Sequence, residues 1–384
     1  MWRNIVSNFL TILIVGLVMI AGLVAWAQRE YAQPGPLANA ACYRVERGAT
    51  IGRVSRDLAD MGAISSAYIF RAGADYAKKA DQLKFGSYLL EPSASMEGIV
   101  EQITRGGPST CGSELNMRIG VRANDAVLRE LDPATGSFVE VAKWRPAEED
   151  TPAAVTKARE KGDLRLRVTI AEGVTSWQVV QGLNGIEALT GEVASVPAEG
   201  TLAPDSYQIS KGDDRNALIA EMAGRQAKLL ADAWAGRDAD LPYQTPEEAL
   251  VMASIIEKET GVPTERKQVA SVFVNRLRQG MKLQTDPTVI YGVTKGEGVL
   301  DRGLRQSELK RETPYNTYVI DGLPPTPIAN PGAASIEAAM HPDATQYLFF
   351  VADGSGGHAF ATTLDEHNRN VAAWRKIEKE SAAQ

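Results

Sequence analysis

The stretch that decides the fold is residues 246–261, which read PEEALVMASIIEKETG. Thr245 just before it can cap a helix N-terminus, and Pro246 suits the first helical position. Glu248 would complete a capping box with Thr245. The pattern therefore predicts a helix that ends at Gly261.

One residue of this predicted helix is unusual. At 3.6 residues per turn, Glu257 shares a side with apolar or very small residues, namely Leu250, Ala253, Ser254 and Gly261. A carboxylic acid among small side chains has room for a ligand and surroundings that favour its protonated form, as a general acid needs. Glu259 points about 200° away round the axis and is the alternative acid. An ordinary amphipathic helix with a glutamate at its edge would show the same pattern.

Composition sets broad limits. The chain has 384 residues, enough for two or three domains, and its 44% hydrophobic and 23% charged residues are typical of globular proteins. A net charge of -7 argues against nucleic-acid binding. The two cysteines and three histidines lack zinc-ligand spacing, and no phosphate-binding loop or dinucleotide motif occurs. We therefore expect no metal, no cofactor and no nucleic-acid partner.

An apolar run occupies residues 9–27, which are 19 residues without a charge. As a helix it would be about 28 Å long, close to the hydrocarbon thickness of a bilayer. A small-x-small sequence at 25–27 also fits a cleaved signal peptide, but the run is longer than a usual signal core, which favours an uncleaved anchor. We expect residues 1–8 in the cytoplasm, the bulk of the chain outside it, and a tether at 28–41.

Residues 42–107 predict a compact unit. The patterns indicate a strand at 43–45, helices at 51–61 and 66–79, a strand at 86–90 and a helix from Ser95 to Gly106.

Part of this unit recurs later in the chain. The sequence VERGAT at 45–50 matches IAEGVT at 170–175, and a strand at Tyr207 parallels the one at Tyr88. This βα unit resembles the LysM-like carbohydrate-binding modules of cell-wall proteins. A stable scaffold without sugar affinity would repeat in the same way.

Two features between the copies stay open. Cys42 and Cys111 could form a disulfide in an oxidising compartment, but two unpaired buried thiols fit the sequence nearly as well. Residues 108–162 hold strand-like patches at 116–121 and 137–141 and a polar segment, and are interpreted as an insertion or linker without a legible function.

The C-terminal half combines helices with polar loops. Helices are predicted at 213–237, 265–278 and 365–377, and a hairpin at 347–360 with His358 in its glycine-rich turn. Gln284 and Asp286 would share one side of an extended segment that Pro287 terminates. A proline-rich loop at 322–332 is stiff and would hold polar groups in place.

Several segments occur in a recognisable order. They are ASIIEKET at 253–260, LQTDPTVIY at 283–291, YNTY at 315–318, and the loops at 322–332 and 353–360. Together they resemble the MltG (YceG-like) family of endolytic murein transglycosylases, over roughly residues 43–374 and most strongly over 245–360. The region 108–162 departs from the family pattern.

The predicted fold class is α+β. It comprises a single N-terminal transmembrane helix, a LysM-like βα module at 42–107 and a mixed α+β catalytic domain at 163–378, followed by a tail at 379–384. The catalytic domain would include a second LysM-like unit at about 165–210.

The resemblance implies a lyase that cuts the MurNAc–GlcNAc bond of nascent peptidoglycan near the membrane and leaves a 1,6-anhydro end. Glu257 matches the family's catalytic glutamate, acting first as acid and then as base. The attacking group is the sugar's own hydroxyl, so a second catalytic carboxylate is not required. The implied location is the bacterial cytoplasmic (inner) membrane, with the bulk on the periplasmic or extracytoplasmic side. Peptidoglycan synthases are suggested as partners.

The candidate substrate-binding residues fall into two groups. Gln284, Asp286 and Asn316 could hydrogen-bond to sugar groups, and Tyr315 and Tyr318 could stack on sugar rings; turns, buried networks and core packing use the same residue types. A hydrolytic glycosidase, with Asp286 activating water opposite Glu257, is one alternative. A membrane-anchored wall-binding scaffold without turnover is another.

Overall fold

The computed structural model describes residues 2–107, 109–162 and 164–382. By contacts the chain forms two compact units. The first comprises Met1–Leu115, Val127–Lys143 and Asp150–Arg165. The second comprises Asn116–Ala126, Trp144–Glu149 and Leu166–Gln384, and holds the predicted catalytic segments.

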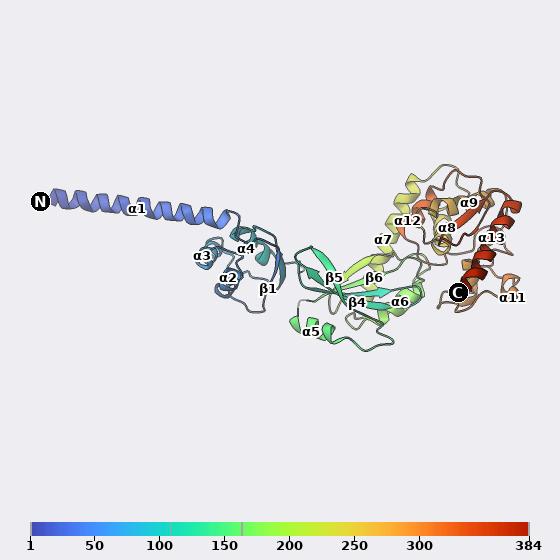
Figure 1. Ribbon diagram of the computed structural model, residues 1–384, viewed down its shortest axis with the longest axis horizontal. Helices are drawn as coiled ribbons and strands as arrows, with labels where there is room; N and C mark the ends of the chain where they lie inside the picture. The colour runs from blue at the N-terminus through green and yellow to red at the C-terminus, as the bar shows by residue number, and fades with distance from the viewer. Residues whose placement is uncertain (1, 108, 163, 383–384) are drawn as a thin grey trace. The chain divides into compact units, whose positions relative to one another are not determined.

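The N-terminal helix α1 spans Trp2–Ala32, drawn in blue in Figure 1. Its part Phe9–Ala32 is long and apolar enough to cross a membrane, with a mean hydropathy of 2.6, although a signal sequence would pass the same test. The helix continues through the first residues of the expected tether, because 28–32 contain no proline or glycine to stop it.

The compact part of the first unit follows the predicted order of elements. It contains β1 (Ala41–Val45), α2 (Ile51–Asp60), α3 (Ala67–Tyr76), β2 (Gly86–Leu90) and α4 (Met96–Arg105). The side chains of Thr50, Ser66 and Ser95 cap the three helices by accepting hydrogen bonds from backbone N–H groups three residues on. Strands β1 and β2 pair antiparallel, with Tyr43 opposite Tyr88.

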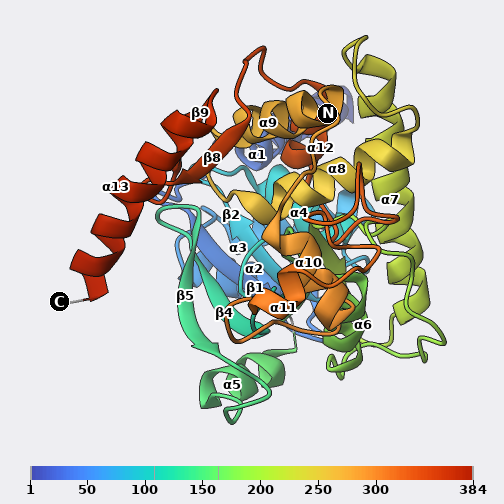
Figure 2. The same cartoon turned by 90° about the vertical axis from the view of Figure 1, so that its right-hand side faces the viewer.

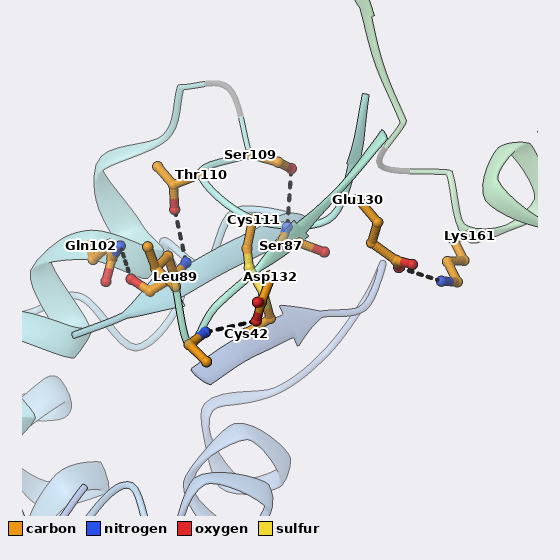
Figure 3. The surroundings of a disulfide bond; sticks show 11 residues. Cys42, Ser87, Leu89, Gln102, Ser109, Thr110, Cys111, Glu130, Asp132 and Lys161 are labelled. Atoms are coloured by element: carbon orange, nitrogen blue, oxygen red, sulfur yellow. Dashed lines mark hydrogen bonds and ion pairs between the residues drawn. A yellow bond between two sulfur atoms is a disulfide. The ribbon is translucent and has the colours of Figure 1, made fainter. Parts of the chain in front are cut away.

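A disulfide joins Cys42 on β1 to Cys111, with the two Cα atoms 5.8 Å apart (Figure 3). The segment just before Cys111 lies beside β2. Ser109 Oγ accepts a hydrogen bond from Ser87 N at 3.0 Å, and Thr110 Oγ1 accepts one from Leu89 N at 2.9 Å. The disulfide thus adds a covalent link to a segment whose side chains already accept hydrogen bonds from the backbone N–H groups of β2.

A five-stranded sheet has the order β5-β4-β3-β6-β7. Its strands are β3 (Ser113–Ile119), β4 (Asp125–Asp132), β5 (Ser137–Trp144), β6 (Arg165–Ile170) and β7 (Ser206–Ile209). The region 108–162, expected to be an insertion or linker, supplies three of these strands and helix α5 (Ala153–Lys161). Its apolar residues Ala126, Val127 and Leu128 are consecutive, so the alternation that marks a half-buried strand is missing.

The repeated sequence motif gives the same local structure twice. In the second copy, β6 leads through a turn into α6 (Ser176–Asn184), which Thr175 caps, and β6 pairs antiparallel with β7. Gly48 and Gly173 occupy equivalent turn positions with φ of +75° and +77°. A side chain there would be strained, so both turns depend on glycine.

Helix α8 (Pro246–Glu259) is the central element of the C-terminal half. It contacts α7 (Arg215–Gly236), α9 (Arg266–Arg278), α10 (Asp286–Thr294) and α12 (Ala333–Met340), and Figure 2 shows it among α7, α9 and α12. All eight residues from Ala249 to Ile256 are buried. This central part of the helix is therefore buried on every side rather than amphipathic, because neighbouring elements cover it.

The ends of α8 and α10 differ in detail from expectation. Thr245 caps α8, but the Glu248 carboxylate accepts from Gln244 N and not from Thr245 N. Pro287 lies in the first turn of α10, so it begins a helix instead of terminating an extended segment. The chain then continues through α11 (Gln306–Leu309), the hairpin β8 (Phe349–Ala352) and β9 (His358–Ala361), and α13 (Leu364–Ala382).

Candidate active site

Glu257 lies in the last turn of α8, where the buried part of the helix gives way to half-buried residues. Its Oε2 accepts a hydrogen bond of 3.0 Å from Gly332 N. Among the residues that the structure describes, this backbone N–H is the one hydrogen-bond donor to the carboxylate. One carboxylate oxygen is thus fixed, and the other accepts no hydrogen bond from the described residues.

The loop 322–332 that carries Gly332 is held on two sides. On α8, Ser254 Oγ accepts from Ile328 N at 3.0 Å. On the turn after β6, the fully buried Asn330 donates from Nδ2 to Val174 O at 3.0 Å. The backbone adds a bond of 2.9 Å from Gly173 N to Asn330 O. These contacts fix the N–H group that faces Glu257.

A second carboxylate, that of Glu172, also lies next to Gly332. A Cβ atom added to Gly332 would be 1.8 Å from Glu172 Oε1. Arg266 Nη2 of α9 is 3.8 Å from Glu172 Oε2. Burial and then the nearby charge of Glu257 raise the pKa of Glu172, and Arg266 opposes them. Two acids therefore meet around one backbone amide.

Lys258 supplies a cation beside these acids. Its Nζ donates to Gly173 O at 3.1 Å. Burial lowers the pKa of Lys258, and the negative charges of Glu257 and Glu199 oppose this shift. Burial also raises the pKa of Glu199, which accepts from Ser176 N at 2.8 Å and Tyr291 Oη at 3.2 Å.

Sequence reasoning did not identify Glu172, Glu199, Lys258 or Arg266. One signal was present for Glu172. It occupies the repeated turn at the position where the first copy has Arg47.

Glu259, the alternative acid, lies in a different environment. Thr285, at the start of α10, donates its side-chain hydroxyl to Glu259 Oε1. Burial raises the pKa of Glu259 to about 7; the Thr285 bond opposes this shift, and the nearby charge of Asp286 adds to it. The Glu259 side chain thus connects the end of α8 to the beginning of α10.

Three of the predicted sugar-binding residues lie on the Glu259 side. Tyr318 Oη donates to Asp286 Oδ1 at 2.7 Å. Gln284 is exposed, with a left-handed backbone at φ +51°, and its N–H donates to Thr317 O at 3.1 Å. Among the described residues, no hydrogen bond or ion pair joins Gln284, Asp286 or Tyr318 to Glu257.

The other two predicted residues are used inside the protein. Asn316 is fully buried, its Nδ2 donates to the carbonyls of Glu308, Leu309 and Arg311, and its Oδ1 accepts from Tyr318 N. Internal hydrogen bonds therefore occupy the Asn316 amide in this structure, and its sugar contact stays a prediction. Tyr315 packs against Tyr291 with ring centroids 5.0 Å apart, and its Oη is 2.7 Å from Thr326 Oγ1.

The remaining candidates are His358 and side chains that could bind a metal ion. His358 begins β9, and Glu265 binds it through His358 N at 2.9 Å and Nδ1 at 2.8 Å, so it anchors the hairpin. Among the described residues, no group of three or more His, Cys, Asp or Glu side chains could hold a metal ion.

Comparisons with known proteins agree on one family. The sequence model of the YceG-like family matches residues 142–373, more than half of the chain. A Bacillus subtilis protein named endolytic murein transglycosylase is 40% identical over 173 residues, which are 45% of this chain and 47% of that protein. A Streptococcus pneumoniae protein of the same name is 25% identical over 338 residues, 85% of this chain and 57% of that protein. The chain thus spans about half the length of these curated relatives.

Among solved structures, a yceG-like protein from Listeria monocytogenes is 26% identical, with a TM-score of 0.46. The match covers 86% of this chain and 99% of the Listeria chain.

Proposed function

Because the chain belongs to the YceG-like family, we propose that it is an endolytic peptidoglycan lytic transglycosylase that cleaves the MurNAc–GlcNAc bond without water. The family match and the names of the relatives support the reaction class. The observation that carries the proposal is Glu257, held by one oxygen on Gly332 N at the end of a rigid, buried helix.

In this mechanism Glu257 first acts as a general acid. It protonates the glycosidic oxygen while the bond from that oxygen to the anomeric carbon of MurNAc breaks. The resulting carboxylate then takes the proton from the C6 hydroxyl of the same sugar, whose oxygen attacks the anomeric carbon. Glu257 ends protonated again, the MurNAc product is a 1,6-anhydro sugar, and no water is consumed. The Gly332 N–H stabilises the carboxylate between the two steps.

We assign a different task to Glu259. Its hydroxyl partner Thr285 and its burial fit a structural acid that ties α8 to α10. Next to it, the exposed Gln284 and Asp286 remain our candidates for sugar contacts, with Tyr318 orienting the Asp286 carboxylate. Tyr315 would take part only through its packing on Tyr291.

The membrane and the wall complete the proposal. Helix α1 would anchor the protein in the bacterial cytoplasmic membrane, with the bulk of the chain on the extracytoplasmic side, where its substrate is made. The two LysM-like units would hold glycan, and peptidoglycan synthases would be partners at the same membrane.

The test is a digest of purified peptidoglycan with the full-length protein in detergent, followed by mass spectrometry of the products. We expect 1,6-anhydro ends, and a loss of at least about 100-fold in rate for Glu257→Gln. Glu247→Gln, on an exposed position of the same helix, serves as the matched control.

Each other result points elsewhere. Reducing ends that carry added water would show that the protein is a hydrolase and refute the proposal. Asp286 would then be the candidate base. An intact substrate with the wild-type protein would favour the non-catalytic scaffold. Full activity of Glu257→Gln combined with loss in Glu259→Gln would move the chemistry to the second acid.

A further inference from the structure

The second copy of the repeated turn carries an acid toward the candidate catalytic residue, whereas the first copy does not. Residues 45–50 and 170–175 align so that Arg47 and Glu172 occupy the same position, each just before a left-handed glycine. In the first copy the Arg47 guanidinium lies over the Phe85 ring, 4.8 Å from its centroid. The shared turn therefore does not require an acid at this position.

The surroundings of Glu172 place it in the active site. Its Oε1 occupies the space that a side chain on Gly332 would need, and Gly332 N is bonded to Glu257. Gly173, the next residue, faces Glu257 from the same turn: a Cβ added there would be 3.6 Å from Glu257 Cγ. Two carboxyl groups from different elements thus converge on one backbone segment.

We propose that Glu172 is a positioning residue for Glu257: it packs against Gly332, which holds the Glu257 carboxyl group, and its negative charge favours a proton on Glu257 for the leaving glycosidic oxygen. This inference rests on the proposed function. Burial and then the nearby charge of Glu257 raise the pKa of Glu172, because like charges at close range repel. A negative charge beside a general acid helps that acid to keep its proton, so the acid stays available over a wider range of pH.

Charges on each neighbouring element bear on this pair. Arg266 of α9 faces Glu172, and its Nε is buried without a hydrogen-bond partner among the described residues. Lys258 of α8 lies beside Glu257 and donates to the carbonyl of Gly173, with Glu199 beyond it. Arg266 and Lys258 partly offset the repulsion between the two carboxylates. Burial still raises the pKa of Glu172.

The experiment measures the rate of anhydro-end formation on purified peptidoglycan from pH 5 to 9, with the full-length protein in detergent. Glu172→Gln keeps the size of the side chain and removes its charge. We expect the alkaline limb of its profile to move to lower pH by about half a unit, a modest shift because Glu172 is nearly half exposed and water screens its charge. At the alkaline end this is a roughly threefold loss of rate.

Two further variants make the result specific. Glu172→Asp retains the carboxylate and should keep the wild-type limb. Glu187→Gln removes an exposed acid of the same α6 region and should also keep it. A Glu172→Gln limb at the wild-type pH would overturn the inference. So would a uniform loss of rate at every pH together with a lower melting temperature, which indicates a merely structural role.

Failure of the proposed function has a separate signature. If Glu257→Gln forms anhydro ends at the wild-type rate, both the function assigned to Glu257 and this inference are wrong. If Glu257→Gln is inactive but Glu172→Gln leaves the profile unchanged, only the role of Glu172 is wrong.

Discussion

Replacement of Glu259 by glutamine should stabilise the protein at alkaline pH and not at acid pH. Burial raises the pKa of Glu259 from 4.5 to about 7, with the nearby charge of Asp286 adding to this rise. The folded state thus holds the proton more tightly than the unfolded state does. This contribution to stability is present below pH 4.5 and is lost as the pH rises through about 7.

The magnitude follows from the same two values. A rise from 4.5 to about 7 corresponds to a cost of about 3 kcal/mol for ionising the folded protein at pH 8. At pH 5 most of this cost is absent. Glutamine cannot ionise, and its side-chain oxygen can still accept the hydrogen bond from Thr285. The free energy of unfolding of Glu259→Gln, minus that of wild type, should therefore be about 2 kcal/mol larger at pH 8 than at pH 5.

Chemical denaturation at the two pH values measures this difference, with tryptophan fluorescence as the probe because Trp234 packs against the core around α8. Glu247→Gln, the same change at an exposed position of the same helix, should give equal differences from wild type at both pH values. The reasoning is refuted if Glu259→Gln also shows no dependence on pH. A destabilised variant at both pH values would mean that Thr285 requires a carboxylate.

The sequence was most informative where local rules and tertiary structure agree. Ser95 was recognisable as the start of a helix because a hydroxyl before an apolar periodic run satisfies backbone N–H groups. The repeat around Gly173 was legible because its turn needs a left-handed glycine. Both features depend on a few neighbouring residues.

It was least informative where residues distant in the chain meet. Asn316 has the chemistry of a sugar ligand, and only its burial among three backbone carbonyls reveals another use. The second acid near Glu257 comes from Glu172, 85 residues earlier in the chain than Glu257. Pro287 could end a strand or begin a helix, and packing of α10 on α8 decides for the helix. Such choices depend on contacts that spacing does not encode.

Two variants test Gly332 beside Glu257 and the disulfide of the first unit. Gly332→Ala should lower the rate of anhydro-end formation at alkaline pH by about threefold, as for Glu172→Gln, because its methyl group would come within 1.8 Å of Glu172 Oε1 and force that exposed side chain away from Glu257. At Gly303 an added Cβ atom would have no neighbouring atom within 4 Å, so Gly303→Ala is the control, with no expected loss of rate. In the first unit, the double variant Cys42→Ser, Cys111→Ser opens a loop with a sequence separation of 69, worth about 4 kcal/mol in unfolded-chain entropy. Its melting temperature should fall to that of the reduced wild type. Equal melting temperatures of oxidised and reduced wild-type protein would show instead that the contacts of Ser109 and Thr110 with β2 suffice to hold this segment.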